Sequence, residues 1–275
     1  MHKDRQMSEK EMRMLAQKPE ISLSGIASGR FMEQYEEYVS DQFAGRDTWV
    51  RIKTFADSVA GRTEEGGVFK GKDHYLMEDV AVADESDLKE NLDAMKNFKE
   101  RYPDIQMHMM LVPNAANIES DKLPGYAVTE NQEKQFKAIH STLGSVYTWV
   151  DVSDILKKHR SEEIYYHTDH HWTTLGAYYG YQALSKSMKL DTSKTSDMKP
   201  YAVTNAFNGT LASTSGYETG YEEPIYIYAP DNLKNATEAV VNNVNEKKKT
   251  ASLYDTSKLK GKDKYALFLG GNYPI

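Results

Sequence analysis

Between residues 86 and 190 the sequence alternates between amphipathic helical patterns and short apolar runs. Apolar residues recur every three or four positions in the helical parts, whereas the runs between them are short and nearly continuous. The pattern predicts helices over 86–101, over 130–143 and from Thr173 or Thr174 to about Leu190, and strands over 105–112 and 146–152. Because strands that alternate with helices form a helix-covered sheet with parallel strands, we expect an α/β fold.

The residues before this alternation are expected to form helices as well. Ser8 and Glu11 have the spacing of a capping box, which predicts a short charged helix that ends at about Gln17. Aromatic and aliphatic residues recur at helical spacing over 30–42 and 47–60, which predicts two amphipathic helices. Aromatic stripes of this kind usually belong to a protein core, so we expect both stripes to be buried.

We place the main domain at 28–275, after an N-terminal segment, 1–27, that is partly flexible or helical. Residues 191–264 combine short aromatic strands with many Thr, Ser, Asn and Gly residues, so we expect a small β-rich peripheral insertion there. Residues Tyr265 to Leu269 are expected to form a strand that leads into a turn. A chain that stops at a strand and a turn is expected to be truncated at its C-terminus.

The composition excludes several kinds of chemistry. The 275 residues include no cysteine, which excludes disulfides, thiolate zinc sites, iron–sulfur clusters and a cysteine nucleophile. The formal charge of −7 disfavours nucleic acid as a partner, because neutralising phosphates requires a basic face. No apolar run approaches the roughly 20 residues that span a bilayer, and the start lacks the apolar part of a signal peptide. The chain is therefore either cytosolic or an exported segment without its targeting part.

The densest group of reactive side chains lies at 165–172, in the run Tyr-Tyr-His-Thr-Asp-His-His-Trp. In one interpretation Asp169 orients His171, whose other ring nitrogen takes a proton from a hydroxyl nucleophile. In a second, His167, Asp169 and His171 bind a metal ion, since alternate residues of an extended segment share a face. In a third, the histidines cap the next helix or satisfy buried polar groups. Spacing alone leaves all three open.

The run Thr168-Asp169-His170-His171-Trp172-Thr173 resembles the signature of the bacterial DHHW proteins, which are similar to the SGNH-hydrolase-like domains of alginate O-acetyltransferases. Weaker matches follow in family order from about residue 28 onward: Val68-Phe69-Lys70-Gly71-Lys72-Asp73, Leu111-Val112-Pro113-Asn114-Ala115-Ala116, Phe207-Asn208-Gly209-Thr210-Leu211 and Phe268-Leu269-Gly270-Gly271-Asn272. The resemblance implies an SGNH-hydrolase-like three-layer α/β sandwich with a mostly parallel central sheet in permuted order.

In the acetyltransferase relatives, an Asp and a His serve a serine that comes later in the chain, in a Gly-Asp-Ser-Tyr-like turn. The resemblance therefore implies that Asp169 is the orienting carboxylate and His171 the general base. At the corresponding turn this sequence has Gly271 and Asn272, and an amide cannot be acylated as a hydroxyl can. We expect the serine either to be replaced by Asn272 or to lie beyond Ile275, and the chain as it stands to be inactive.

Further residues are candidates for substrate contacts or for the nucleophile. Asn114 is a candidate for holding the substrate or an oxyanion, although an Asn at such a position more often stabilises a turn. His170 and Trp172 are candidates for lining a sugar-binding cleft, and Trp172 equally fits the core beneath the next helix. Ser213 and Ser215 are the internal substitutes for the serine, in a stretch that is more often only a loop.

The leading hypothesis is an extracytoplasmic domain, at the cell surface or in the periplasm, that transfers or removes an acyl group at a polysaccharide hydroxyl. By resemblance the acyl group is acetyl, and a membrane-bound acyltransferase is an expected partner. We expect no cofactor, no metal and no nucleic-acid partner. Two alternatives remain: a non-catalytic carbohydrate-binding or scaffold protein of the envelope, which Asn272 favours, and a metal-dependent hydrolase that uses the His-rich run.

Overall fold

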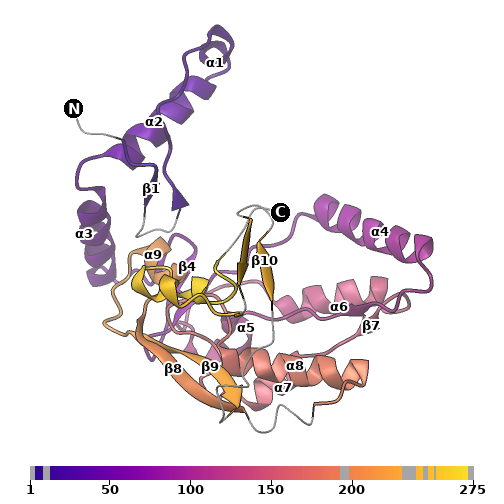
Figure 1. The fold of residues 1–275 in the computed structure, drawn as a ribbon. Helices are drawn as coiled ribbons and strands as arrows, with labels where there is room; N and C mark the ends of the chain where they lie inside the picture. Colours follow the sequence, from indigo (N-terminus) through magenta and orange to yellow (C-terminus); the bar gives the residue numbers. More distant parts are fainter. Residues whose placement is uncertain are drawn as a thin grey trace.

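The computed structural model describes residues 4–8, 13–192, 198–230, 240–243, 247–250 and 252–271 (Figure 1). Its α-helices are α1 (Leu23–Ala27), α2 (Arg30–Gln42), α3 (Arg46–Val59), α4 (Glu85–Arg101), α5 (Ala115–Ile118), α6 (Gln132–Leu143), α7 (Ser153–Lys158), α8 (Thr174–Met188) and α9 (Thr210–Ser215). Its 3₁₀ helices include η1 (Ser120–Lys122), η4 (Thr256–Lys260) and η5 (Lys264–Leu267). Its strands are β1 (Met7–Ser8), β2 (Arg13–Met14), β3 (Glu64–Glu65), β4 (Val68–Lys70), β5 (Leu76–Glu78), β6 (His108–Met109), β7 (Thr148–Trp149), β8 (Met198–Phe207), β9 (Glu223–Pro230), β10 (Val241–Asn243) and β11 (Lys248–Thr250).

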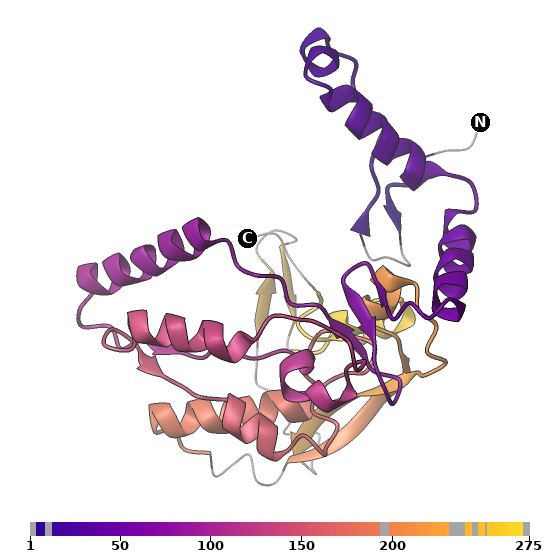
Figure 2. The same cartoon turned by 180° about the vertical axis from the view of Figure 1, so that it is seen from behind.

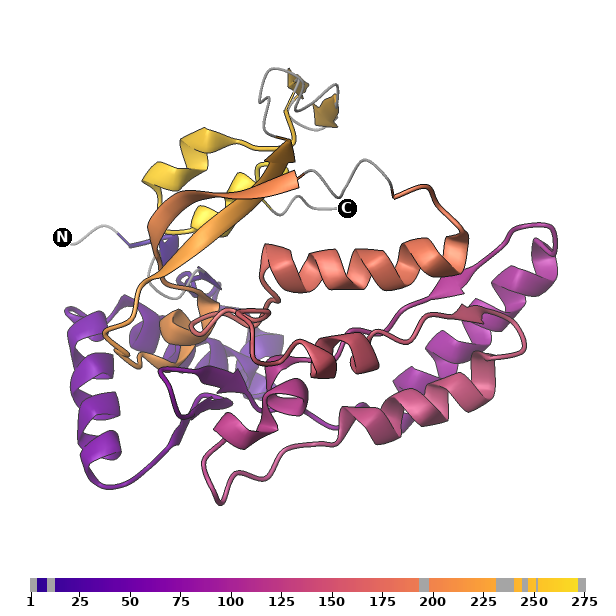
Figure 3. The same cartoon turned by 90° about the horizontal axis from the view of Figure 1, so that it is seen from below.

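The helices expected from the alternation are confirmed as α4, α6 and α8. A side chain caps the start of each one: Asp84, Asn131 and Thr173 accept hydrogen bonds from amides of the first turn. Such caps satisfy amides that have no partner within the helix. In Figures 1 and 3, α4 lies beside α6, and α7 lies beside α8.

The parallel pairing expected between 105–112 and 146–152 is confirmed over only two residues of each segment. β6 and β7 pair in parallel, with His108 opposite Thr148 and Met109 opposite Trp149. The other strand pairs among the described residues are antiparallel and belong to separate small sheets. The described strands therefore do not form the expected mostly parallel central sheet, because neither β6 nor β7 has a second neighbouring strand in the described part.

A three-stranded antiparallel sheet of β3, β4 and β5 packs into the main core. β4 and β5 pair antiparallel, with Phe69 opposite Met77. The core joins this hairpin to the segment before the candidate site. Its buried members are Phe69, Tyr75, Met77, Ala115, Ala116, Ile118, Val152, Leu156, Ile164 and Tyr165.

The N-terminal residues form an arm that extends away from the body (Figures 1 and 2). The prediction of a helix from Ser8 was wrong: β1 and β2 form a short antiparallel pair there, and residues 9–12 lie outside the described ones. Hydrogen bonds to the end of α2 stabilise this pair of strands in place of the helix that the Ser8–Glu11 spacing predicted. Gln42 accepts a hydrogen bond from the amide of Arg5 at 2.9 Å. Asp41 accepts one from the amide of Ala16 at 2.8 Å.

The helices α2 and α3 confirm the expected elements, but their apolar stripes are largely exposed. Tyr35, Trp49 and Phe55 are 42%, 59% and 72% exposed. α3 turns a different face to the body, where the hydroxyl of Thr54 donates to the carbonyl of Ser215 at 3.1 Å. The expectation of buried stripes was wrong, because periodicity identifies an apolar face and not an element that covers it.

β8 and β9 form the longest strand pair, and α9 lies in the connection between them. β9 contacts α8, and the hydroxyl of Thr174 donates to the carbonyl of Tyr226 at 2.6 Å (Figure 3). β9 therefore packs against α8, and the peripheral insertion expected over 191–264 stays a prediction. The domain boundaries at 27 and 28 stay a prediction.

The strand expected over Tyr265–Leu269 is not formed, because these residues belong mostly to η5. The carboxylate of Asp263 accepts a hydrogen bond from the amide of Ala266 at 3.2 Å and so caps this turn. Phe268 makes an isolated antiparallel bridge with Tyr254, without a longer strand beside it in the described part. None of the helices in the described ranges is long and apolar enough to cross a membrane.

Candidate active site

The candidate site is the loop between Ile164 and Thr173, which closes on itself like a hairpin. The amide of Thr173 donates to the carbonyl of Ile164 at 2.9 Å and joins the two ends. Between these ends residues 167–171 bend, whereas the sequence suggested an extended segment. Asp169 and His171 therefore meet within a bend and not along one face of a strand.

Trp172 anchors this loop to α8. Its backbone forms an antiparallel bridge with Tyr165, and its side chain packs partly buried against the main core. A Cβ at Gly176 would lie 2.2 Å from the carbonyl oxygen of Ile164, and one at Gly180 would lie 2.7 Å from the ring of Trp172. Glycine at these positions lets the helix approach the loop closely. The structure thus gives Trp172 a packing role beneath α8.

Asp169 and His171 form a close acid–base pair. Nδ1 of His171 lies 2.6 Å from Oδ1 of Asp169, and the backbone amide of His171 donates to the same oxygen at 3.0 Å. Asp169 is 2% exposed. Burial raises its pKa, but hydrogen bonds from His171 and Thr210 outweigh burial and lower the pKa to about 2. An ionised carboxylate in this position fixes the Nδ1–H tautomer of His171 and stabilises a positive imidazole.

The second oxygen of Asp169 is held by the start of α9, which the sequence analysis missed. The amide and the hydroxyl of Thr210 donate to Oδ2 at 2.8 and 3.0 Å. A Cβ at Gly209 would lie 2.3 Å from Cβ of Asp169, so the close approach requires glycine. The run Phe207–Leu211 was only a weak family match, and this match was the signal that could have identified both residues.

Tyr265 packs flat against His171 and was also missed. The two rings stack with centroids 4.5 Å apart and planes inclined by 22°. Burial and the nearby charge of Asp169 raise the pKa of Tyr265 to about 12, so its hydroxyl stays neutral. The His171 side chain is 39% exposed, and its Nδ1 is bonded to Asp169. The ring is therefore held on one edge and one face, and Nε2 is the nitrogen left for proton transfer.

The remaining substrate candidates lie in different places. His170 is next to the pair, with its side chain 41% exposed and its Nδ1 2.7 Å from the hydroxyl of Thr210. Asn114 caps α5 instead, where its side chain accepts a hydrogen bond from the amide of Asn117 at 3.2 Å. The hydrogen bonds of Asn114 join it to Gln132 and Asn117, and this capping role is the turn-stabilising one.

Neither internal serine is placed as a nucleophile. Ser215 is completely buried, and its hydroxyl donates to the carbonyl of Leu211 at 2.7 Å. The hydroxyl of Ser213 donates to the carbonyl of Gly209 at 3.1 Å. Asn272, the residue expected at the serine position, lies outside the described residues.

The metal-binding set of the second interpretation is not assembled. The ring nitrogens of His167 contact a backbone carbonyl at 3.1 Å and Glu163 at 2.7 Å. In the described part, Asp169, His170 and His171 each place one ligand atom within 4.8 Å of the others. A metal ion there would compete with the four hydrogen bonds that Asp169 already accepts. The donor set is therefore better suited to an acid–base pair.

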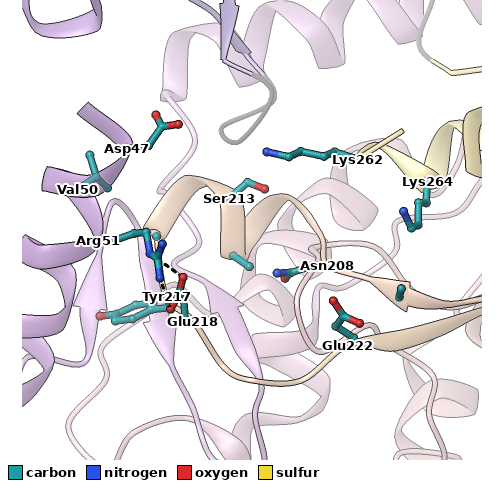
Figure 4. A pocket seen from close by; sticks show the side chains of 13 residues that line it. Asp47, Val50, Arg51, Asn208, Ser213, Tyr217, Glu218, Glu222, Lys262 and Lys264 are labelled. Atoms are coloured by element: carbon teal, nitrogen blue, oxygen red, sulfur yellow. Dashed lines mark hydrogen bonds and ion pairs between the residues drawn. The ribbon is translucent and has the colours of Figure 1, made fainter. Parts of the chain in front are cut away.

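A pocket of about 320 Å³ with several polar lining residues lies beside the segment that holds Asp169 (Figure 4). Asn208 and Ser213 line it from the β8–β9 connection, together with Glu222, and Lys262 and Lys264 line it from the approach to η5. The same connection supplies the residues that bond to Asp169, and the same η5 supplies the ring that stacks on the imidazole. The β8–β9 connection and η5 therefore both line the pocket and contact the Asp169–His171 pair.

The fold and the site define an α/β domain with an Asp–His pair in a loop of DHHW sequence. Residues 68–260 match the family described as the SGNH hydrolase-like domain of the acetyltransferase AlgX. This match spans more than half of the chain, so the chain belongs to this family. The resemblance to DHHW proteins and to the alginate acetyltransferase domain is confirmed. No curated protein sequence matches the chain.

Solved structures with the same fold include a DHHW family protein from Eubacterium siraeum. It is 21% identical, with a TM-score of 0.55, over 76% of this chain and 69% of that one. Bacillus cereus PatB1, solved with a sulfonyl adduct, is 19% identical, with a TM-score of 0.56, over 75% of this chain and 70% of that one. These likenesses support an SGNH-hydrolase-like α/β fold.

Proposed function

We propose that this domain takes part in acyl transfer to, or removal from, a hydroxyl of a cell-envelope polysaccharide, with acetyl as the acyl group. The observation that carries the proposal is the 2.6 Å contact between Asp169 and Nδ1 of His171 within the DHHW loop. Membership in a family described as acetyltransferase supports the acyl group. The supporting structure is thus a general base with its orienting carboxylate.

In the proposed mechanism, Nε2 of His171 takes the proton of a serine hydroxyl as the serine oxygen attacks the acyl carbonyl. Asp169 stabilises the imidazolium, which then returns the proton to the leaving group as the donor ester breaks. In the second half, His171 takes the proton of the polysaccharide hydroxyl as that oxygen attacks the acyl-serine, and His171 returns the proton to the serine oxygen as the acyl-serine bond breaks. The described residues supply the base and the carboxylate. By the resemblance the serine position corresponds to Asn272, which lies outside the described residues.

The substrate, the location and the partner belong to the same proposal. The pocket of Figure 4 offers amide, hydroxyl, carboxylate and ammonium groups, which suit the hydroxyls of a sugar chain, next to the residues that hold Asp169. A polysaccharide of the envelope requires an extracytoplasmic location. A membrane-bound acyltransferase would then deliver the acyl group to this side of the membrane.

The test is acetyl release from 4-nitrophenyl acetate by the protein expressed from its complete reading frame. His171→Ala should lower the rate by about 10²–10⁴-fold, because a general base contributes that much. His140→Ala is the matched control, since His140 lies on the exposed side of α6 and should leave the rate unchanged. The isolated 275-residue chain should be inactive.

Two outcomes would overturn the proposal. Equal rates for the wild type and His171→Ala would remove the base from the reaction. A complete protein that binds an envelope polysaccharide but has no esterase or transferase activity would favour a non-catalytic carbohydrate-binding protein instead.

A further inference from the structure

Glu223 is a buried carboxylate that bonds to the candidate loop from another part of the chain. It begins β9 and is 4% exposed. Its Oε2 accepts a hydrogen bond from the amide of His167 at 2.8 Å. Its Oε1 accepts hydrogen bonds from the amide and the hydroxyl of Thr168 at 2.9 and 2.6 Å. One side chain therefore fixes two consecutive residues of the loop, immediately before Asp169.

Thr168 is held from the opposite side by the start of α9. Its hydroxyl oxygen accepts a hydrogen bond from the amide of Gly209 at 2.9 Å. Its carbonyl accepts one from the amide of Ala212 at 3.2 Å. Thr168 is thus clamped between Glu223 and the segment whose next residue, Thr210, bonds to Asp169. The two oxygens of Asp169 and the backbone before it are positioned by one connected network.

The chemistry of this network suits a carboxylate at position 223. All three groups that face it from the loop are donors, and a carboxylate is the side chain that only accepts. A glutamine of the same shape would point an amide donor at a donor of the loop. Burial raises the pKa of Glu223, and the hydrogen bonds from Thr168 and His167 oppose that rise. The loop thus supplies the partners that a buried charge needs.

We propose that Glu223 is a positioning residue of the acid–base pair: it fixes residues 167 and 168 so that Asp169 meets Nδ1 of His171. Glu223 acts through the loop backbone and touches neither reacting group. The importance of this arrangement for catalysis rests on the proposed function, whereas the arrangement itself is tested without it.

The test measures the side-chain proton on Nδ1 of His171 by NMR in the full 275-residue chain. A proton held between imidazole and carboxylate gives a strongly downfield signal, and Asp169→Asn identifies it by removing the carboxylate. Glu223→Gln should cause most of the upfield shift that Asp169→Asn causes. Glu78→Gln is the matched control: Glu78 is an exposed strand glutamate on β5, and its substitution should leave the signal in place.

If Glu223→Gln does not fold, a second pair of variants, at Thr168, tests the same network. Thr168→Val removes the hydroxyl that joins Glu223 to Gly209, and Thr168→Ser retains it. The signal should move in Thr168→Val and return in Thr168→Ser. A folded Glu223→Gln or Thr168→Val chain with an unchanged His171 signal would overturn the proposal and leave Glu223 a purely structural role. Since no substrate is needed, failure of acyl transfer would not affect this result.

Discussion

The helices of the N-terminal arm, α1 to α3 at residues 23–59, and the loop at 164–173 place their side chains in opposite environments. Along the arm, apolar side chains are exposed: Leu23 is 89% and Phe55 72% exposed. In the loop, polar side chains are buried: Thr168 is completely buried and Asp169 is 2% exposed. Each region thus departs from the usual rule that apolar groups lie inside and polar groups outside.

The difference indicates which side chains of this protein contribute most to its stability. An exposed apolar side chain gains little from folding, so its identity has little influence on stability within the chain. A buried polar atom left without a hydrogen bond costs about 1–3 kcal/mol, so each partner of a buried polar side chain matters. Thr168 and Asp169 are bonded to such partners within residues 209–223. We therefore expect stability to depend strongly on the loop network and weakly on the arm.

Glu223→Ala should have the largest effect. It removes the acceptor of three buried donors, each of which costs about 1–3 kcal/mol when left unpaired, so we expect a loss on the order of 3–9 kcal/mol. The measurement is the free energy of unfolding in urea. Glu78→Ala, on the exposed end of β5, should change it by less than about 0.5 kcal/mol. Similar values for both variants would show that buried and exposed carboxylates contribute equally to stability.

Gly209→Ala should have the next largest effect. The new Cβ would lie 2.3 Å from Cβ of Asp169 and 2.5 Å from its Oδ2, so the loop and α9 must separate. Overpacking of this kind costs about 1–3 kcal/mol. Gly125→Ala is the control, because a Cβ there meets nothing within 4 Å. If both variants unfold at the same urea concentration, the close approach of Gly209 to Asp169 is not required.

The pH dependence of stability should show the contribution of Asp169. Its pKa is lowered from 3.8 to about 2 in the folded protein. A lowered folded-state pKa stabilises the fold above pH 4, and this contribution is lost as the pH falls from about 4 to about 2. The difference corresponds to about 2 kcal/mol. The test compares the unfolding free energy of the wild type with that of Asp169→Asn across this range. A constant difference between the two proteins would contradict the assigned ion pair.

The sequence predicted the helices of this fold well because their signals are local. Asp84, Asn131 and Thr173 cap helices within a few residues of their own position, and the apolar period follows from the helix itself. The capping pattern at Ser8 misled for the opposite reason, since contacts with the end of α2 decide that region. Local patterns therefore sufficed wherever no distant segment competed.

The candidate site was predicted only in part. Asp169 and His171 are two residues apart, and the resemblance identified both. Thr210 and Tyr265 contact this pair, and Glu223 bonds to the two residues before it. All three come from segments 39 or more residues further along the chain. Neither spacing nor periodicity reports such contacts, because they depend on how β8, β9 and η5 fold against the loop. The exposure of the apolar side chains of α2 and α3 could not be predicted either, because it depends on which other segments pack against these helices.

Phe55→Ser should have the smallest effect, and its neighbour on α3 provides the control. Phe55 is 72% exposed, so its replacement should change the unfolding free energy by less than about 0.5 kcal/mol. Thr54 is 3% exposed and bonds to the carbonyl of Ser215, so Thr54→Val should cost about 1 kcal/mol. We therefore expect Thr54→Val to lower the unfolding free energy more than Phe55→Ser does. A loss above 1 kcal/mol for Phe55→Ser would mean that another surface covers this face of α3 in solution.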